Sequence, residues 1–361
     1  TVGLEPVNPV HITRLSIEPD VDNSCFKLQV NATGDSEATA DIRLSDPDGN
    51  TVASLQGVAT GTPCTLPVNA PELWSPEHPY LYDLNITLSS EGQQTDAVKS
   101  YCGMRKIEVK NVDGTPRIFL NDTQIFQMGP LDQGWWPDGL YTAPSDEALL
   151  FDIKAMKELG FNMIRKHIKV EPSRWYMHCD REGILVWQDL PSPNLPAGHE
   201  AFARQNFEEE AVRIIDAFEN HPSIVQWVVF NEGWGQFDTE RMTQVVIDKV
   251  SPQSLVCCAS GWNDAEIGDI KDSHSYPYPS CPIDQKRACV NGEYGGITLK
   301  VPGHIWPGGD FGYTTVETPE DFTIMFNDLA DKIKDHYYYG LNAAVYTQLS
   351  DVEIEKNGIY T

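Results

Sequence analysis

Residues 207–232, "FEEEAVRIIDAFENHPSIVQWVVFNE", decide the fold of this chain. In the first part, through Pro222, apolar residues recur at helical spacing between charged ones, which predicts an amphipathic helix. The second part, "SIVQWVVFN", is almost continuously apolar, as is typical of a strand buried on both faces in a parallel sheet. A helix that leads into such a strand is one unit of an α/β fold, and Glu232 follows where this strand ends.

The same alternation continues on both sides of this stretch. The other strand candidates are 125–129, 161–165, 184–189, 254–260, a segment near 269–275, 288–293 and 342–348. The other helix candidates are 146–160, which starts behind Pro144 and Ser145 and ends at Gly160, then 172–183, 239–250 and 319–340. Eight strands alternating with helices predict an α/β fold of the (β/α)8 type, a TIM barrel.

Residues 1–105 have a different pattern. Segments such as "CFKLQVNA" and "LYDLNITLSS" alternate apolar and polar residues and are separated by turn clusters such as "DPDGN". We therefore expect an immunoglobulin-like β-sandwich at 1–105, followed by the TIM barrel at 106–361. No helical stretch follows the eighth strand candidate, so we expect a barrel cut short there, or another segment that covers this side.

Composition excludes several classes of function. A net charge of −27 over 361 residues repels nucleic acid and anionic membranes, and no apolar run is long enough to span a bilayer. The eight cysteines are too sparse for a disulfide scaffold and form no CxxC pair, so buried free thiols are expected, with one or two disulfides as the alternative. Thr1 suggests that a leader was removed or lies outside this sequence. A periplasmic or secreted location is slightly preferred, and a homo-oligomer is possible.

Two carboxylates stand at the ends of predicted barrel strands, where barrel enzymes place their chemistry. Glu232 follows the fourth strand and Glu293 the seventh, and glycines beside both would let a substrate approach the backbone. Strands four and seven face each other across a barrel mouth. Glycoside hydrolysis needs such a pair, with one carboxyl group of raised pKa as acid and one ionised as nucleophile or base.

Simpler interpretations remain open for each residue. Glu232 and Glu293 are ordinary exposed loop carboxylates in the alternative view. Trp135 and Trp136 fit a core or an interface as well as a sugar platform, and His167 and His274 fit structural roles. No compact cluster of metal ligands is visible in the sequence, so neither a metal nor a cofactor is expected.

Several motifs together resemble glycoside hydrolase family 2, which includes β-galactosidases, β-glucuronidases and β-mannosidases. "PELWSPEHPYLYDLNITL" is similar to the signature of the family's immunoglobulin-like domain, and "YCGMRKIEV" to its junction with the barrel. "RWYMHCDREGILVWQD" resembles its second helix and third strand. "FNEG" resembles its acid/base motif and "GEYGG" its nucleophile motif. The resemblance covers nearly the whole chain, although the family's usual N-terminal jelly-roll domain has no counterpart in it.

The resemblance implies a retaining mechanism with carboxyl groups about 5–5.5 Å apart. Glu232 would act as general acid and then base, and Glu293 would form the glycosyl-enzyme. Three further roles are implied: Asn231 would bind the sugar 2-hydroxyl, Tyr276 would orient Glu293, and Arg165 would keep Glu293 ionised.

Some positions depart from the family pattern. Ile168 stands where the family usually has a histidine, and His167 lies one place earlier. The first loop, "GPLDQGWWPDG", is unusual, and Tyr346 and Gln348 replace a common strand-eight tryptophan. These positions suggest Asp132, Trp135, His167 and Gln348 as sugar contacts or supporting residues.

The function expected from the sequence is that of a retaining exo-β-glycosidase with a carbohydrate substrate and β-galactosidase-like specificity. A β-glucuronidase-like or β-mannosidase-like specificity is the first alternative. An inactive fragment or non-catalytic carbohydrate-binding protein is the second, and a metal-dependent barrel hydrolase is the third.

Overall fold

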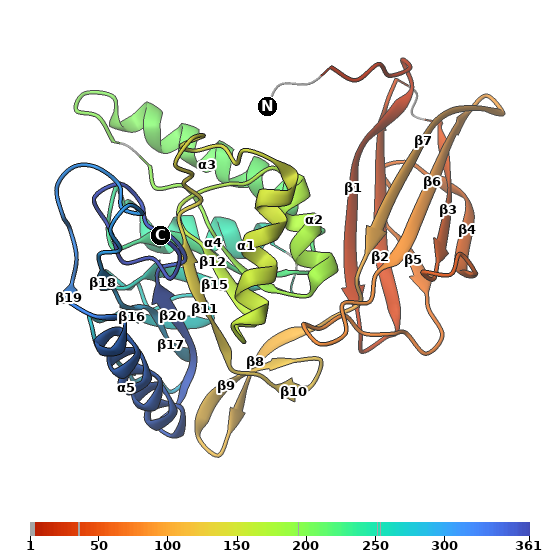
Figure 1. Ribbon diagram of the computed structural model, residues 1–361. Helices are drawn as coiled ribbons and strands as arrows, with labels where there is room; N and C mark the ends of the chain where they lie inside the picture. The colour runs from red at the N-terminus through yellow and green to blue at the C-terminus, as the bar shows by residue number, and fades with distance from the viewer. Residues whose placement is uncertain (1–3, 35–36, 194, 251, 253) are drawn as a thin grey trace. The chain divides into compact units, whose positions relative to one another are not determined.

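A computed structural model describes residues 4–34, 37–193, 195–250, 252 and 254–361 (Figure 1). The chain forms two compact units, each with its own core. The first unit comprises Thr1–Lys106 and Glu219–Pro222, and the second comprises Ile107–Phe218 and Ser223–Thr361.

The first unit is a sandwich of two antiparallel sheets. One sheet has the order β1-β2-β5 and the other β4-β3-β6-β7. The strands are β1 (His11–Asp20), β2 (Cys25–Thr33), β3 (Thr39–Ser45), β4 (Thr51–Ala59), β5 (Cys64–Pro67), β6 (Tyr82–Ser90) and β7 (Gln93–Cys102). Side chains from both sheets, including Phe26, Leu28, Ile42 and Leu84, share one buried core. The predicted sandwich is confirmed, but β1, β5 and β7 had not been recognised in the sequence.

The second unit begins with a small antiparallel sheet that the sequence interpretation did not separate from the barrel. Its strands are β8 (Ile107–Val112), β9 (Thr115–Leu120) and β10 (Thr123–Gln124), in the order β10-β9-β8. Asn342, at the start of the last barrel strand, accepts a hydrogen bond from the amide of Ile118 and donates one to the carbonyl of Pro116. These bonds tie the small sheet to the amino-terminal end of the barrel.

Eight parallel strands then form the nearly closed barrel, which confirms the predicted fold. They are β11 (Gln127–Asp132), β12 (Met163–Lys166), β13 (Leu185–Asp189), β14 (Ile224–Asn231), β15 (Leu255–Ser260), β16 (Ile270–His274), β17 (Ala288–Gly295) and β20 (Leu341–Thr347). Their order is β15-β14-β13-β12-β11-β20-β17-β16. The two outer strands approach each other where the amide of Asp269 donates to the carbonyl of Val256 at 2.8 Å.

The helices of the barrel are α1 (Asp146–Glu158), α2 (Ser173–Glu182), α3 (Glu200–Phe218), α4 (Thr239–Lys249) and α5 (Pro319–Tyr338). As predicted, α1 begins behind Ser145, whose hydroxyl accepts from the amide of Ala148. Two expectations need correction. Helix α3 begins seven residues earlier than predicted, and residues 261–269 and 275–287 contain no helix. These two connections are short and rich in Gly, Pro and Asp, which favour turns.

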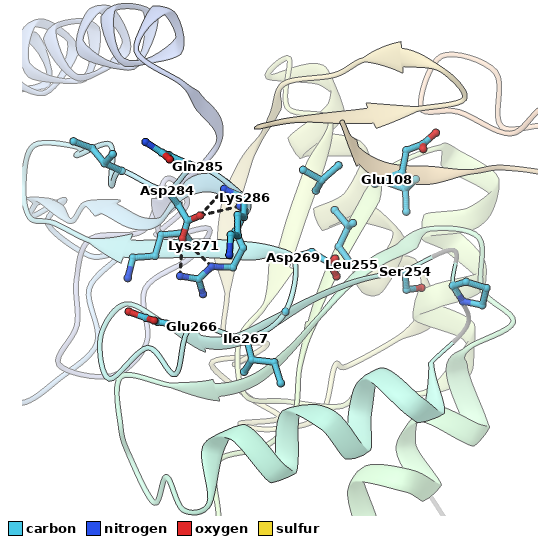
Figure 2. Close-up of a pocket in the computed structure, with 16 residues that line it drawn as sticks. Glu108, Ser254, Leu255, Glu266, Ile267, Asp269, Lys271, Asp284, Gln285 and Lys286 are labelled. Atoms are coloured by element: carbon cyan, nitrogen blue, oxygen red, sulfur yellow. Dashed lines mark hydrogen bonds and ion pairs between the residues drawn. The ribbon is translucent and has the colours of Figure 1, made fainter. Parts of the chain in front are cut away.

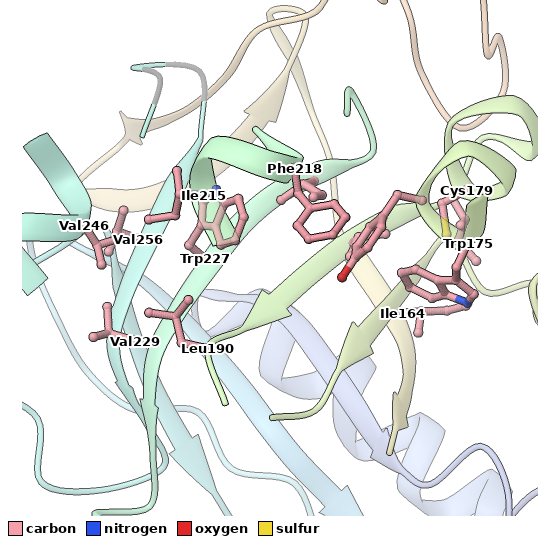
Figure 3. Packing of buried hydrophobic residues seen from close by; sticks show 14 of the residues in the cluster. Ile164, Trp175, Cys179, Leu190, Ile215, Phe218, Trp227, Val229, Val246 and Val256 are labelled. Atoms are coloured by element: carbon pink, nitrogen blue, oxygen red, sulfur yellow. The ribbon is translucent and has the colours of Figure 1, made fainter. Parts of the chain in front are cut away.

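The main core lies between the strands and helices α1 to α4 (Figure 3). Trp175 from α2, Ile215 from α3, and Trp227 and Val229 from β14 meet there. Because β14 is buried along its whole length, the sequence "IVQWVVF" can be apolar on both faces. This packing fixes the position at which β14 ends, and therefore the position of Glu232, which is the next residue.

All eight cysteines are free thiols, and most are buried, as expected. Among the described residues, no helix combines the length and the apolar character that crossing a membrane requires. Two further short strands, β18 (Ile297–Leu299) and β19 (Thr314–Val316), pair with each other in the connection between β17 and α5.

Candidate active site

A pocket of about 320 Å³ lies at the carboxyl ends of the barrel strands, a volume in the range of small-ligand sites. Both predicted catalytic carboxylates line it. The other lining residues are Leu131, Gln133, His167, Ile168, Ser192, Asn231, Trp234, Tyr276, Tyr313, Thr347 and Glu355. The residues come from strand ends and loops far apart in the sequence, as the barrel topology requires.

Glu232 enters the pocket from the turn after β14. Its backbone has φ 52°, in the left-handed region, and its amide donates to the carbonyl of Ser260 at 2.9 Å. Such a conformation is uncommon for a residue other than glycine and is often found at functional sites. Oε1 of Glu232 lies 2.6 Å from Nδ1 of His274, and Oε2 accepts from Nε1 of Trp234 at 3.4 Å.

Glu293 lies within β17 and is held from two sides. The Tyr276 hydroxyl donates to Oε2 of Glu293 at 2.6 Å, and NH1 of Arg165 donates to Oε1 at 3.3 Å. Burial, followed by the charge of Glu293, raises the pKa of Tyr276 well above its ordinary value, so its hydroxyl remains a donor. Because Tyr276 has only one proton to donate, the Thr347 hydroxyl must be the donor in its 2.7 Å contact with Tyr276.

Arg165 is fully buried beneath the pocket, and its hydrogen-bonding capacity is used within the protein. Besides Glu293, it donates to both carboxylate oxygens of Asp189, to Oδ1 of Asn231 and to the carbonyl of Gly292. These contacts account for its five N–H groups. Burial acts to raise the pKa of Asp189, but the positive charge of Arg165 together with hydrogen bonds from His167 and Arg165 outweighs burial and lowers that pKa. Arg165 therefore acts as a fixed positive charge behind the nucleophile position.

His274, at the end of β16, joins Glu232 to a buried chain of polar groups. Its Nε2 lies 2.8 Å from the Ser260 hydroxyl, which donates to Oδ2 of Asp272 at 2.5 Å. Burial lowers the pKa of His274, but the charge of Glu293 and the hydrogen bond to Glu232 raise it above its ordinary value overall. The sequence pattern also fits a structural role for His274, but its Nδ1 contacts both Glu232 and Glu293.

The electrostatic state of Glu232 differs from the expectation of a raised pKa for the acid. Burial acts to raise the pKa of Glu232, but the hydrogen bond and positive charge of His274 outweigh it, so the pKa is lowered. Because His274 is only 2.6 Å away, the two groups titrate as a coupled pair.

The glycines next to the two carboxylates are required by packing within the protein. A Cβ atom on Gly292 would lie 2.2 Å from Oδ2 of Asp272, and one on Gly233, at φ 80°, would lie 2.2 Å from Nδ2 of Asn263. At both positions protein groups occupy the space that a side chain would need.

The remaining predicted site residues fall into two groups. Asn231 and His167 line the pocket, and the Arg165 bond to Oδ1 of Asn231 leaves its NH2 group as the end available to a hydroxyl. Asp132, Trp135 and Gln348 do not line it. Asp132 pairs with buried Lys166, Trp135 packs edge-on against Tyr141, and Gln348 is fully buried behind Gln133.

Some pocket residues were missed by sequence reasoning. Trp234 is adjacent to Glu232 and 67% exposed, so its place in the "NEGWG" motif was a usable signal. Tyr313 stacks on Tyr276 with ring centroids 3.5 Å apart. Tyr313 and Glu355 lie in segments without helical or strand periodicity, so nothing in the sequence pattern placed them at the barrel mouth.

One group of side chains has the spacing of a metal site. Glu232, His274 and Glu293 offer ligand atoms that all lie within 4.8 Å of one another. Each is already bonded to protein groups: Glu232 to His274, His274 to Ser260, and Glu293 to Tyr276 and Arg165. A cation there would compete with the buried charge of Arg165, so the donor set does not favour one.

A larger hollow of about 950 Å³ lies away from this site, near the amino-terminal ends of β15, β16 and β17 (Figure 2). Its polar wall includes Lys271, Asp284 and Arg287. Arg287 pairs with Asp264 and Asp284, and Lys271 also pairs with Asp264. This end of a TIM barrel serves stability, and the hollow contains neither of the two predicted catalytic carboxylates.

Comparison with known proteins finds the same family in both parts of the chain. Residues 10–105 match the model described as glycosyl hydrolases family 2, and residues 143–294 match the TIM barrel domain of glycosyl hydrolases family 2. A β-galactosidase from Lactococcus lactis is 29% identical over 230 residues, covering 62% of this chain and 22% of the relative. A putative β-glucuronidase from Formosa agariphila is 28% identical over 248 residues, covering 66% of this chain and 30% of the relative.

A solved structure shows the same fold. The β-glucuronidase from Ruminococcus gnavus in complex with D-glucuronic acid superposes with a TM-score of 0.76 at 17% sequence identity, covering 97% of this chain and 65% of that one. At this identity the likeness concerns the fold alone.

The fold and the two carboxylates define a barrel protein of the glycosidase type with an immunoglobulin-like domain. The chain belongs to glycosyl hydrolases family 2. It spans less than a third of the length of the two curated relatives described above.

Proposed function

We propose that this chain carries the catalytic site of a retaining exo-β-glycosidase that hydrolyses terminal β-linked sugars. The observation that carries the proposal is the placement of Glu232 and Glu293, whose carboxylate oxygens approach within 4.8 Å across one pocket. This separation supports retention, because inverting enzymes need a wider gap for a water molecule. In this proposal, residues 1–105 form the immunoglobulin-like domain and residues 106–361 the catalytic barrel.

In the first step, Glu293 attacks the anomeric carbon while Glu232 donates a proton to the leaving oxygen. The glycosidic bond breaks and a covalent glycosyl-enzyme forms on Glu293. In the second step, Glu232 removes a proton from water, which attacks the anomeric carbon and releases the sugar with its β configuration retained.

The surrounding residues prepare Glu293 for this chemistry. Arg165 and Tyr276 stabilise its ionised form and orient its two oxygens by separate hydrogen bonds. In this proposal Asn231 donates to the sugar 2-hydroxyl, and His167 and Trp234 line the pocket together with the two carboxylates. The fixed donors need no reorientation during the reaction, which favours the charged transition state.

β-Galactosidase-like specificity is the first assignment, with β-glucuronidase-like or β-mannosidase-like specificity as alternatives. Curated relatives of comparable identity carry the names β-galactosidase and putative β-glucuronidase. The deciding experiment is an assay of aryl β-glycosides by the protein that contains this chain, with proton NMR of the first sugar formed. We expect the β anomer first; the α anomer would contradict the retaining mechanism.

A metal-dependent hydrolase is the alternative to test, because Glu232, His274 and Glu293 have the spacing of a donor group although their bonds to protein groups do not favour a cation. Removal of divalent cations by a chelator separates the two proposals. The glycosidase proposal predicts unchanged turnover after chelation and loss of turnover in Glu293→Gln. Chelator-sensitive turnover that survives in Glu293→Gln would favour the metal enzyme.

An inactive fragment or a non-catalytic carbohydrate-binding protein is the remaining alternative. Turnover of aryl glycosides by a longer protein, but not by residues 1–361 alone, would identify the chain as an incomplete enzyme. Sugar binding without turnover in either form would favour the non-catalytic role.

A further inference from the structure

The pocket contains a third carboxylate that the proposed mechanism does not use. Glu355 lies in the segment after β20 and lines the pocket together with Glu232 and Glu293. Its backbone is fixed by reciprocal hydrogen bonds with Val352, at 2.9 and 3.0 Å. The side chain is therefore presented to the pocket from a defined turn.

Neutral amides hold the Glu355 carboxylate in place. Oε2 accepts from Nε2 of Gln133 at 3.0 Å, and Oε1 accepts from Nδ2 of Asn357 at 3.3 Å. Gln348, which is fully buried, bonds both amides: it accepts from Gln133 and donates to Asn357, each at 2.9 Å. Glu355 is thus positioned without an ion pair to any of these partners.

The basic side chains near Glu355 are bonded to other groups. Lys356, the next residue, is 4% exposed and pairs with Asp310 at 2.8 Å. The N–H groups of Arg165 are occupied by protein acceptors, as described above. Among the residues that the structure describes, no lysine or arginine lines the pocket, and His167 is the one lining residue that can acquire a positive charge.

The carboxylates in the pocket affect one another electrostatically. Burial raises the pKa of Glu355, and the negative charge of Glu293 adds to this, while Asn357, Gln133 and His167 act to lower it. A ligand carboxylate would add a further negative charge to this partly desolvated space. Like charges at a few ångströms in such surroundings strongly disfavour binding, whereas a sugar hydroxyl can donate to Glu355.

We propose that Glu355 makes the pocket selective for a neutral sugar by accepting a hydrogen bond from a sugar hydroxyl and excluding the carboxylate of a uronic sugar. The proposal rests on the assignment of this pocket as the glycosidase site. This selectivity for neutral sugars would distinguish the chain from the R. gnavus β-glucuronidase, which has the same fold and whose structure contains D-glucuronic acid. Glu355 would thus contribute to specificity in two ways, by attracting a sugar hydroxyl and by repelling a carboxylate.

The test compares neutral and uronic substrates in matched variants of the protein that contains this chain. Aryl β-galactoside, β-mannoside and β-glucuronide are assayed with the parent, Glu355→Gln and Glu353→Gln. Glu355→Gln removes the charge and keeps the shape, and Glu353 is an exposed glutamate of the same turn. Calorimetry with isofagomine and its uronic counterpart measures selectivity without requiring turnover.

We expect kcat/KM of the parent for a neutral glycoside to exceed that for the glucuronide by about 100-fold or more. Glu355→Gln should narrow this ratio by about 10-fold or more, and Glu353→Gln should leave it unchanged. The ratio of the isofagomine affinities should change in the same way. Equal or better use of the glucuronide by the parent, or an unchanged ratio in Glu355→Gln, would overturn the proposal.

Failure of the proposed function gives a different result. If the parent turns over no glycoside and binds neither isofagomine, both proposals are wrong. If neutral and uronic glycosides are both hydrolysed with similar efficiency, only the selectivity role of Glu355 is overturned.

Discussion

Nδ1 of His274 lies 2.6 Å from Oε1 of Glu232 and 3.4 Å from Oε2 of Glu293. One imidazole therefore contacts both carboxylates of the proposed mechanism. Its other nitrogen meets Ser260 and, through it, Asp272. The protonation of Glu232 depends on His274, which makes the histidine a positioning residue for proton transfer.

Replacement of His274 by Asn should change the pH dependence of kcat/KM. The histidine lowers the pKa of Glu232, so its loss raises that pKa and keeps the acid protonated to higher pH. We expect the alkaline limb of the profile to move to higher pH, with a fall in kcat/KM of roughly 10–100-fold. His178→Asn, on α2, is the matched control. An unchanged alkaline limb in an active His274→Asn protein would contradict this role.

Replacement of Tyr276 by Phe removes the hydroxyl that orients Glu293 but retains the ring stacked on Tyr313. A hydrogen bond to a charged group contributes about 1.5–3 kcal/mol, so kcat should fall by roughly 10–100-fold with a smaller change in KM. Steady-state kinetics measure the effect. The control is Tyr278→Phe, because Tyr278 is 48% exposed and does not line the pocket. Equal losses in both variants would argue against a specific role for Tyr276.

Trp234 offers an exposed aromatic surface at the pocket beside Glu232. Trp234→Ala should raise KM for aryl glycosides by about 5-fold or more through lost aromatic contact. The kcat should fall less, since both carboxylates remain. Phe202→Ala serves as the control, because Phe202 is an aromatic residue that is 73% exposed and does not line the pocket. A selective loss of kcat with unchanged KM would show that Trp234 acts mainly through Glu232.

The raised pKa of Asp152 on α1 predicts that the stability of the barrel depends on pH. Burial, with the negative charge of Asp132, raises its pKa to about 7. Between about pH 4 and 7, Asp152 is ionised in the unfolded chain but still protonated in the folded protein. The free energy of unfolding therefore falls as the pH rises through this range, and the full loss persists above pH 7. Asp152→Asn should therefore increase the free energy of unfolding by roughly 1–3 kcal/mol at pH 8 and change it little at pH 4.

Urea unfolding of the parent and of Asp152→Asn at both pH values measures this effect. Glu158→Gln, at the exposed end of the same helix, is the control. A gain of equal size at pH 4 and pH 8 would show that ionisation of Asp152 is not its cause.

The strand-end rule predicted much of the site because barrel topology brings carboxyl ends together. It led to Glu232 and Glu293, and the family resemblance added Asn231 and Tyr276; all four line one pocket. The rule could not distinguish Trp135 from Trp234, since only the path of each loop decides which ring lies at the pocket. Asp132 is directed toward Lys166 because the register pairs these two residues on adjacent strands, a tertiary relationship not visible in either segment alone.

The segment after β20 shows the other limit of the sequence interpretation. Residues 350–361 have neither helical nor strand periodicity, so Glu355 had no predicted position. Its place depends on pairings between distant parts of the chain, such as the bridge of Glu355 to Phe311. Long-range contacts of this kind position the residue that we infer to select the sugar.

Labelling of the nucleophile tests the central claim most directly. The protein is incubated with an activated 2-deoxy-2-fluoro-β-glycoside of the preferred sugar, which slows hydrolysis of a glycosyl-enzyme, and is then digested and analysed by mass spectrometry. The retaining mechanism predicts one covalent sugar on the peptide that contains Glu293, with labelling absent in Glu293→Gln. Labelling of Glu232, or turnover of the parent substrate without any covalent adduct, would contradict the assignment.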